Sequence, residues 1–162
     1  MDSPPRSRAP VFAIVGGIIL LLLCVGIVPA MGAAGVLAAI GIPNFVAFQL
    51  KAKRSEVPAN VDSIRIAELA YRAGFDQYAA AGSESEAARS LTPDAHPWVP
   101  SADFDRIAWR PDSNVRGGYW VVLVGDGFEV HGIIDADGDG VPAHYVATEE
   151  SGAVLVTDQH TY

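Results

Sequence analysis

The feature that most constrains this chain is an uncharged, strongly apolar run that occupies residues 9–50. A membrane-spanning helix needs about 20 apolar residues, so the run is long enough for one long spanning helix or for two short ones. Basic residues flank it on both sides: Arg6 and Arg8 precede it, and Lys51, Lys53 and Arg54 follow it. The sequence therefore predicts a hydrophobic transmembrane region at residues 10–50, preceded by a basic, disordered N-terminus at residues 1–9.

Two arrangements of this run agree with its sequence. In the first, one helix crosses the membrane once, with the N-terminus inside and the rest of the chain outside. In the second, Pro29 marks a turn between two shorter helices at residues 11–28 and 31–48. The second places both basic clusters in the cytoplasm and fits the positive-inside tendency better. The sequence after Leu37, however, favours the first arrangement.

The remainder of the chain is acidic. From Ser55 onward, eighteen Asp and Glu residues stand against six Arg and no Lys, which gives a formal charge of −12. Phosphate backbones would repel such a domain, so we expect no nucleic-acid partner. The sole cysteine, Cys24, lies in the apolar run, so a disulfide within the polar part is excluded.

The apolar run ends in LAAIGIPNF, at residues 37–45, and passes directly into the basic and polar stretch VAFQLKAKRSE. This segment resembles the part of type IV pilins and pseudopilins in which the membrane helix becomes the scaffold of a globular head. The positions that carry the resemblance are Leu37, Ala38, Ala39, Ile40, Ile42, Pro43, Asn44 and Phe45. The family's basic-Gly-Phe processing site and early glutamate have no counterpart, because Leu21, Leu22 and Gly26 stand near those positions.

The resemblance implies a non-enzymatic structural subunit of a pilus, a pseudopilus or a related surface or secretion machine. It implies a single-pass anchor in the inner (cytoplasmic) membrane, with the head outside, and as partners the membrane and other pilin-like subunits or further copies of the chain. A proline inside a helix leaves a backbone group that packed neighbours must satisfy, which favours a bundle. The expected helix-packing residues are Leu37, Ile40, Ile42, Pro43 and Phe45.

Residues 51–82 are expected to form an amphipathic helix. Its apolar positions, spaced by three, four or seven residues, are Val61, Ile64, Tyr71, Phe75 and Tyr78. Gly82 is expected to end the helix as a left-handed cap. Pro58 either kinks this helix or starts a new one.

Residues 83–162 are expected to form a loop followed by an antiparallel sheet. After a loop at residues 82–106, strand-like runs occur at residues 104–109, 118–124, 127–134, 144–148 and 153–156, with turns rich in Asp, Gly and Pro between them. A helix followed by an antiparallel sheet gives an α+β fold. The full prediction is a long N-terminal membrane-spanning helix that continues into an amphipathic helix packed on the sheet, as in a pilin.

The sharpest local motif is DADGDG at residues 135–140. Asp135, Asp137 and Asp139 alternate with small residues, as in the first half of an EF-hand calcium loop. The twelfth position of such a loop would be Val146, where a bidentate Glu belongs. A calcium site and an ordinary Asp-rich hairpin turn both remain open. Calcium is the one cofactor considered, and a membrane-tethered calcium- or ligand-binding sensor without a filament role is the alternative function.

The histidines and serines form no recognisable catalytic or metal-binding pattern. His131, His144 and His160 lack the spacing of zinc sites, and no cysteine joins them, so we expect surface histidines on a sheet. The sequence contains no nucleophile elbow and no phosphate-binding glycine loop in the polar part. We therefore expect no catalytic residue.

Overall fold

The computed structural model describes residues 9–23, 25 and 28–162. The chain forms two compact units, Met1–Val46 and Ala47–Tyr162. The second unit contains the sheet, and we call it the head. The described helices of the first unit are α1 (Ala9–Leu22) and α2 (Val28–Arg54), and the last residues of α2 belong to the head.

The expected membrane-spanning helix is wrong for the described residues, because no helix among them combines the length and the apolar character that a bilayer crossing requires. α1 has 14 residues, which is about 21 Å of helix against a hydrocarbon core of about 30 Å. α2 has 27 residues, but many are Gly and Ala, and Lys51, Lys53 and Arg54 occupy its last turn. This finding corrects both the single-pass inner-membrane anchor and the two-helix hairpin.

The basic residues at the end of α2 make contacts within the head. The Lys53 ammonium donates a hydrogen bond to the carbonyl oxygen of Pro93 (3.3 Å), and the Arg54 guanidinium donates to the carbonyl oxygen of Gln159 (3.0 Å). The same guanidinium lies 5.2 Å from the ring centroid of Tyr162. These two side chains therefore hold neighbouring segments of the head.

Helix α3 (Glu56–Phe75) follows α2 with only its N-cap residue, Ser55, between the two helices. Pro58 is its third residue, where a proline is tolerated because the first turn of a helix has no intrahelical acceptors for its N–H groups. Of the two expected roles for Pro58, starting a new helix is confirmed. The helix ends earlier than Gly82: Asp76 adopts a left-handed conformation (φ 54°), and its N–H donates to the carbonyl oxygen of Arg72 (2.8 Å).

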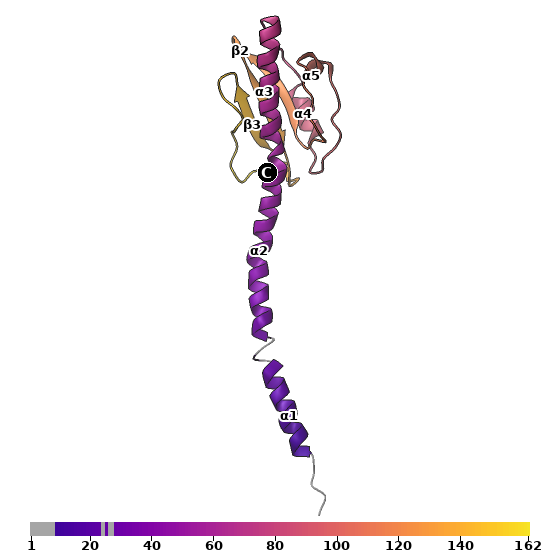
Figure 1. Ribbon diagram of the computed structural model, residues 1–162, viewed down its shortest axis with the longest axis vertical. Helices are drawn as coiled ribbons and strands as arrows, with labels where there is room; N and C mark the ends of the chain where they lie inside the picture. Colours follow the sequence, from indigo (N-terminus) through magenta and orange to yellow (C-terminus); the bar gives the residue numbers. More distant parts are fainter. Residues whose placement is uncertain (1–8, 24, 26–27) are drawn as a thin grey trace, which may run out of the picture. The chain divides into compact units, whose positions relative to one another are not determined.

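One face of α3 packs on the sheet, against β2 (Gly127–Ile134) and β3 (Ala143–Thr148) (Figure 1). Its fully buried positions, spaced by four, three and four residues, are Val57, Val61, Ile64 and Glu68. The expected stripe is confirmed at Val61 and Ile64, and Tyr71 and Tyr78 are half-buried against the same core. Phe75 is 65% exposed, and Tyr78 lies beyond the end of the helix.

The sheet has four antiparallel strands in the order β1-β2-β3-β4, where β1 is Gly118–Val124 and β4 is Val154–Leu155. Four of the five expected strands are confirmed. The fifth, at residues 104–109, is wrong: helix α5 (Ala102–Arg106) begins there, and the Ser101 hydroxyl accepts a hydrogen bond from the N–H of Phe104 (3.4 Å). Phe104 and Ile107 are both buried at a spacing of three residues, which is the period of a helix.

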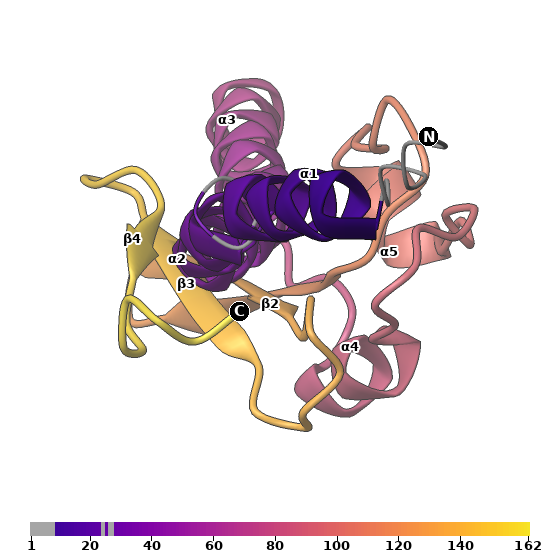
Figure 2. The same cartoon turned by 90° about the horizontal axis from the view of Figure 1, so that it is seen from below.

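Helix α4 (Glu84–Ser90) lies in the segment that was expected to be a loop. Its N-terminus has the Ser-x-x-Glu sequence of a capping box: the Ser83 hydroxyl accepts from the N–H of Glu86 (3.3 Å) and donates to the Glu86 carboxylate (2.8 Å). α4 and α3 lie on opposite faces of the sheet (Figure 2). We call the α3 side the inner face and the α4 side the outer face.

Each face of the sheet has its own apolar cluster. The inner face carries the main core, in which Val121, Val130 and Ala147 are at most 1% exposed. The outer face carries a small cluster of Ala87, Trp120 and Ile133. The alternation of side chains along the strands produces this division. The head is therefore an α+β layer structure with one large core and one minor core.

Candidate functional site

The predicted calcium ligands lie together in the connection between β2 and β3. One carboxylate oxygen from each of Asp135, Asp137 and Asp139 lies within 4.8 Å of the others. Gly138 and Gly140 have positive φ angles of 77° and 85°. These glycines provide the backbone curl that brings alternate residues to one side of the loop.

The loop's own backbone engages the same carboxylates. Both oxygens of Asp135 accept hydrogen bonds, from the N–H of Gly138 (2.7 Å) and the N–H of Gly140 (3.0 Å). One oxygen of Asp139 accepts from the N–H of Val141 (2.8 Å). These hydrogen bonds account for the curled shape without an ion. Each carboxylate oxygen retains a further lone pair, so the loop can still offer oxygen ligands to a hard cation. Calcium binding stays a prediction.

The predicted helix-packing residues lie on α2, and their exposure is high where the structure describes it. Ile40, Ile42 and Phe45 are 61%, 63% and 60% exposed, and Pro43 lies exposed inside the helix. The side chain of Leu37 lies outside the described part of the chain. The exposed apolar set continues along α2 with Val46 and Phe48.

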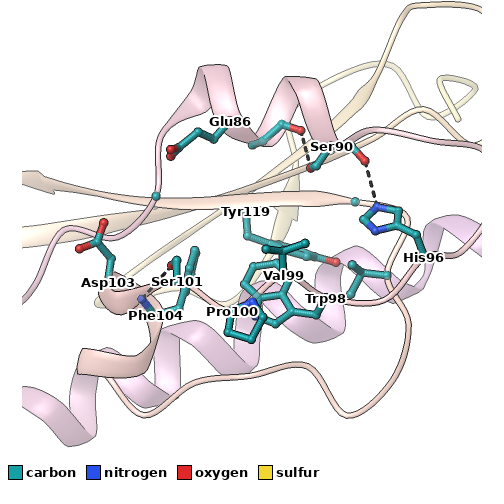
Figure 3. Close-up of a pocket in the computed structure, with 14 residues that line it drawn as sticks. Glu86, Ser90, His96, Trp98, Val99, Pro100, Ser101, Asp103, Phe104 and Tyr119 are labelled. Carbon is teal, nitrogen blue, oxygen red and sulfur yellow. Dashed lines mark hydrogen bonds between the residues drawn. The ribbon is translucent and has the colours of Figure 1, made fainter.

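A cavity of about 280 Å³ lies between α4, the segment before α5, and β1 (Figure 3). Glu86 and Asp103 line one end of it, and Ser90 and His96 line the other. Its wall includes the aromatic rings of Trp98, Phe104 and Tyr119. Sequence reasoning missed this cavity because its residues come from segments that were expected to be one long loop and a strand.

The two serines and the histidine of this cavity contact the backbone. The Ser90 hydroxyl donates to the carbonyl oxygen of Ala87 (2.8 Å), and the Ser101 hydroxyl caps α5. The His96 ring lies 3.0 Å from the carbonyl oxygen of Ser90 through Nε2 and 3.1 Å from that of Pro97 through Nδ1. These contacts hold residues 96–101 against the aromatic wall of the cavity. Neither serine hydroxyl is hydrogen-bonded to a basic side chain.

The inner core contains one buried acid. Glu68 is 0% exposed, and one of its carboxylate oxygens accepts from the N–H of Ala79 (3.0 Å). The other oxygen has no hydrogen-bond partner among the described residues. Burial raises the pKa of the Glu68 carboxyl, and the hydrogen bond from Ala79 offsets part of that rise. The contact ties the segment after α3 back onto the helix.

The three histidines considered in the sequence do not form one group. His131 and His144 lie on neighbouring strands and contact each other, whereas the ring of His160 lies 3.3 Å from the side-chain amide of Gln159. His131 and His144 lie on strands of the sheet, as expected, but they are half-buried, and their mutual contact was not expected. His160 lies outside the strands. Spacing along the chain did not indicate this pair, because the register between β2 and β3 brings them together.

Comparison with known proteins gives no match: no protein-family model, no curated protein and no solved structure resembles the chain closely enough to identify it.

Proposed function

We propose that the chain is a structural subunit that resembles type IV pilins and pseudopilins and assembles through α2 with copies of itself or with related subunits. The observation that carries this proposal is the set of exposed apolar side chains along α2, namely Ile40, Ile42, Phe45, Val46 and Phe48. Successive residues of a helix are rotated by about 100°, so these five are spread over most of its circumference. A helix that is apolar all round is normally buried against other structure.

Two features of the chain support a structural role. The segment LAAIGIPNF at residues 37–45 resembles the pilin stretch that joins the assembly helix to the head. In the head, α3 packs on an antiparallel sheet, which is the arrangement that this resemblance implies. The last turn of α2 is also fixed within the head through Lys53 and Arg54.

The test is self-association of the full chain, measured by sedimentation velocity over a range of concentrations. Phe45→Asp places a charge in the apolar set, whose burial without a partner would be costly, so we expect association to weaken at least tenfold. Asn114→Asp is the matched control, because it adds the same charge at an exposed loop position of the head, away from α2. It should associate like the wild type.

Two results would contradict the proposal. One is a wild-type chain that stays monomeric at every soluble concentration, both alone and when mixed with related subunits. The other is Phe45→Asp protein that assembles as the wild type does. Far-ultraviolet circular dichroism of each variant establishes that the helices are retained.

A calcium-binding module is the second candidate function, and the convergence of the Asp135, Asp137 and Asp139 carboxylates favours it. In this case calcium would stabilise the head, because an ion that binds only the folded state shifts the unfolding equilibrium by mass action. Substitutions on α2 would then leave the calcium effect unchanged. The two candidates are therefore separable in the same protein.

A further inference from the structure

Two histidines from neighbouring strands meet on the outer face of the sheet. His131 of β2 pairs with Val146, and His144 of β3 pairs with Ile133, so the two histidines are diagonal neighbours on one face. The Nδ1 atom of His131 lies 3.0 Å from the Nε2 atom of His144. Two ring nitrogens from separate strands thus face each other at hydrogen-bond distance.

The other ring nitrogen of His131 contacts a carboxylate. The Nε2 atom of His131 lies 3.3 Å from a carboxylate oxygen of Glu129, two residues earlier on the same strand and the same face. An ionised carboxylate only accepts hydrogen bonds, so His131 carries its proton on Nε2 and presents a lone pair at Nδ1. A carboxylate behind a histidine is the usual outer partner of a metal-binding imidazole, because it fixes the tautomer and the ring orientation.

Trp120 holds both imidazole rings in place. Its indole stacks on His131 with ring centroids 4.8 Å apart and planes 6° apart, and on His144 at 5.5 Å and 25°. Trp120 is itself 6% exposed and belongs to the outer-face cluster under α4. The side chain of His131 is 14% exposed, so the pair is largely shielded but still reachable from solvent.

The electrostatic surroundings keep the pair neutral yet attractive to a cation. Burial lowers the pKa of both histidines, so both rings are uncharged at neutral pH. A metal ion can therefore bind them without displacing an extra proton from either ring. The charge of Glu84, at the start of α4, acts on both rings and offsets part of this lowering of their pKa values. Glu84 and Glu129 therefore supply negative charge around two neutral imidazoles.

We propose that His131 and His144 bind a divalent transition-metal ion through Nδ1 and Nε2, respectively. Zinc–imidazole bonds of about 2.0–2.1 Å at angles between 90° and 109° place two ligand nitrogens about 2.9–3.4 Å apart. The separation of 3.0 Å lies in this range. On binding, the proton on His144 Nε2 moves to its Nδ1, while His131 keeps its proton towards Glu129, so each ring stays neutral.

The ligand set defines the class of ion. Imidazole nitrogens suit Cu²⁺, Ni²⁺ and Zn²⁺, with Cu²⁺ bound most tightly, whereas Ca²⁺ prefers oxygen ligands. Water fills the remaining positions. The site differs in its chemistry from the Asp135–Asp139 loop, and it does not depend on assembly through α2.

The test is calorimetric titration of the full chain, purified without a histidine tag, with Cu²⁺, Zn²⁺ and Ca²⁺. We expect the histidine pair to take one equivalent of Cu²⁺ and, more weakly, one of Zn²⁺. His144→Gln should weaken Cu²⁺ binding at least tenfold. His160→Gln is the matched control and should bind like the wild type, because His160 lies apart from the pair. Cu²⁺ should also quench the fluorescence of Trp120, and Trp120→Phe identifies that part of the signal.

Several results would overturn the proposal. These are a wild-type chain that takes up no stoichiometric Cu²⁺ or Zn²⁺, a His144→Gln variant that binds as tightly as the wild type, and transition-metal binding that disappears in Asp137→Asn instead. If the histidine variants do not fold, nitrogen NMR of the wild-type rings decides the question. Zn²⁺ should shift Nδ1 of His131 and Nε2 of His144, and unchanged signals at these two atoms would refute the site.

Discussion

The approach of α3 to the sheet depends on the absence of a side chain at Gly132. A Cβ atom at this position of β2 would lie 2.5 Å from Cγ2 of Val61 and 2.7 Å from Cγ1 of Val57. Carbon atoms in favourable contact are about 3.5–4.0 Å apart, so the helix would have to lift by about 1 Å or both valines would have to change rotamer. Both valines are 0% exposed and β-branched, and they have little freedom to do so.

Gly132→Ala should therefore destabilise the head. Overpacking of a core costs about 1–3 kcal/mol, and added contacts as short as 2.5 Å place this case at about 2–3 kcal/mol. Removing a strand glycine returns up to about 1 kcal/mol, which leaves a net loss of about 1–2 kcal/mol. At roughly 4 °C per kcal/mol, the melting temperature should fall by about 4–8 °C. Thermal and urea unfolding of the full chain, followed by circular dichroism, would measure both quantities.

Two further variants make this prediction specific. Gly74→Ala is the matched control, because Gly74 lies in α3 with nothing within 4 Å of its added Cβ. This variant should be more stable by up to about 1 kcal/mol. In a Val61→Ala background, which removes one of the clashing methyl groups, Gly132→Ala should cost less by about 0.5 kcal/mol or more. A Gly132→Ala protein as stable as the wild type, or an equal cost in both backgrounds, would refute the close-approach argument.

Two other predictions concern carboxylates. Because burial raises the pKa of Glu68 above its ordinary value of 4.5, its ionisation opposes folding, and wild-type stability should fall as the pH rises through the folded-state pKa. Glu68→Gln keeps an oxygen for the Ala79 N–H, so its stability advantage should be absent near pH 4 and grow towards pH 8; urea unfolding at each pH would show this, and a constant difference would contradict it. For the Asp loop, millimolar Ca²⁺ should raise the melting temperature of the wild type and not that of Asp135→Asn, with Asp126→Asn as control; equal shifts in all three proteins would place the calcium effect elsewhere.

The strands were predictable from the sequence because each has a period of two and a turn signal at its ends. The runs at residues 118–124 and 127–134 match β1 and β2 in full. The run at residues 104–109 failed because its apolar residues, Phe104 and Ile107, also fit a helical spacing, and the Ser101 cap decides between the two. The Ser-x-x-Glu pattern at Ser83 and Glu86 is a sequence signal for the start of α4. The segment was expected to be a loop because it is rich in Ser, Pro and charged residues.

The end of α3 and the pairing of the histidines were not predictable in the same way. Phe75 and Tyr78 extend the apolar stripe in sequence, but the helix ends at Asp76, which adopts a left-handed conformation. Glycine is the usual residue at such a position, so an aspartate there gave no sequence signal for the end of the helix. The contact between His131 and His144 depends on strand register, which the length and shape of the connection between β2 and β3 set. The Asp135–Asp139 cluster was predictable because all of its ligand atoms come from one short loop.

The packing of α3 against β2 and β3 has a consequence for synthesis of the chain. Val57, Val61 and Ile64 emerge from the ribosome long before Val130 and Ala147, which cover them in the native head. At translation rates of about 5–20 residues per second, the strands that cover this stripe are synthesised several seconds after it. During that interval the stripe at residues 57–64 is exposed, and it would be a binding site for a chaperone that recognises short apolar helical stripes.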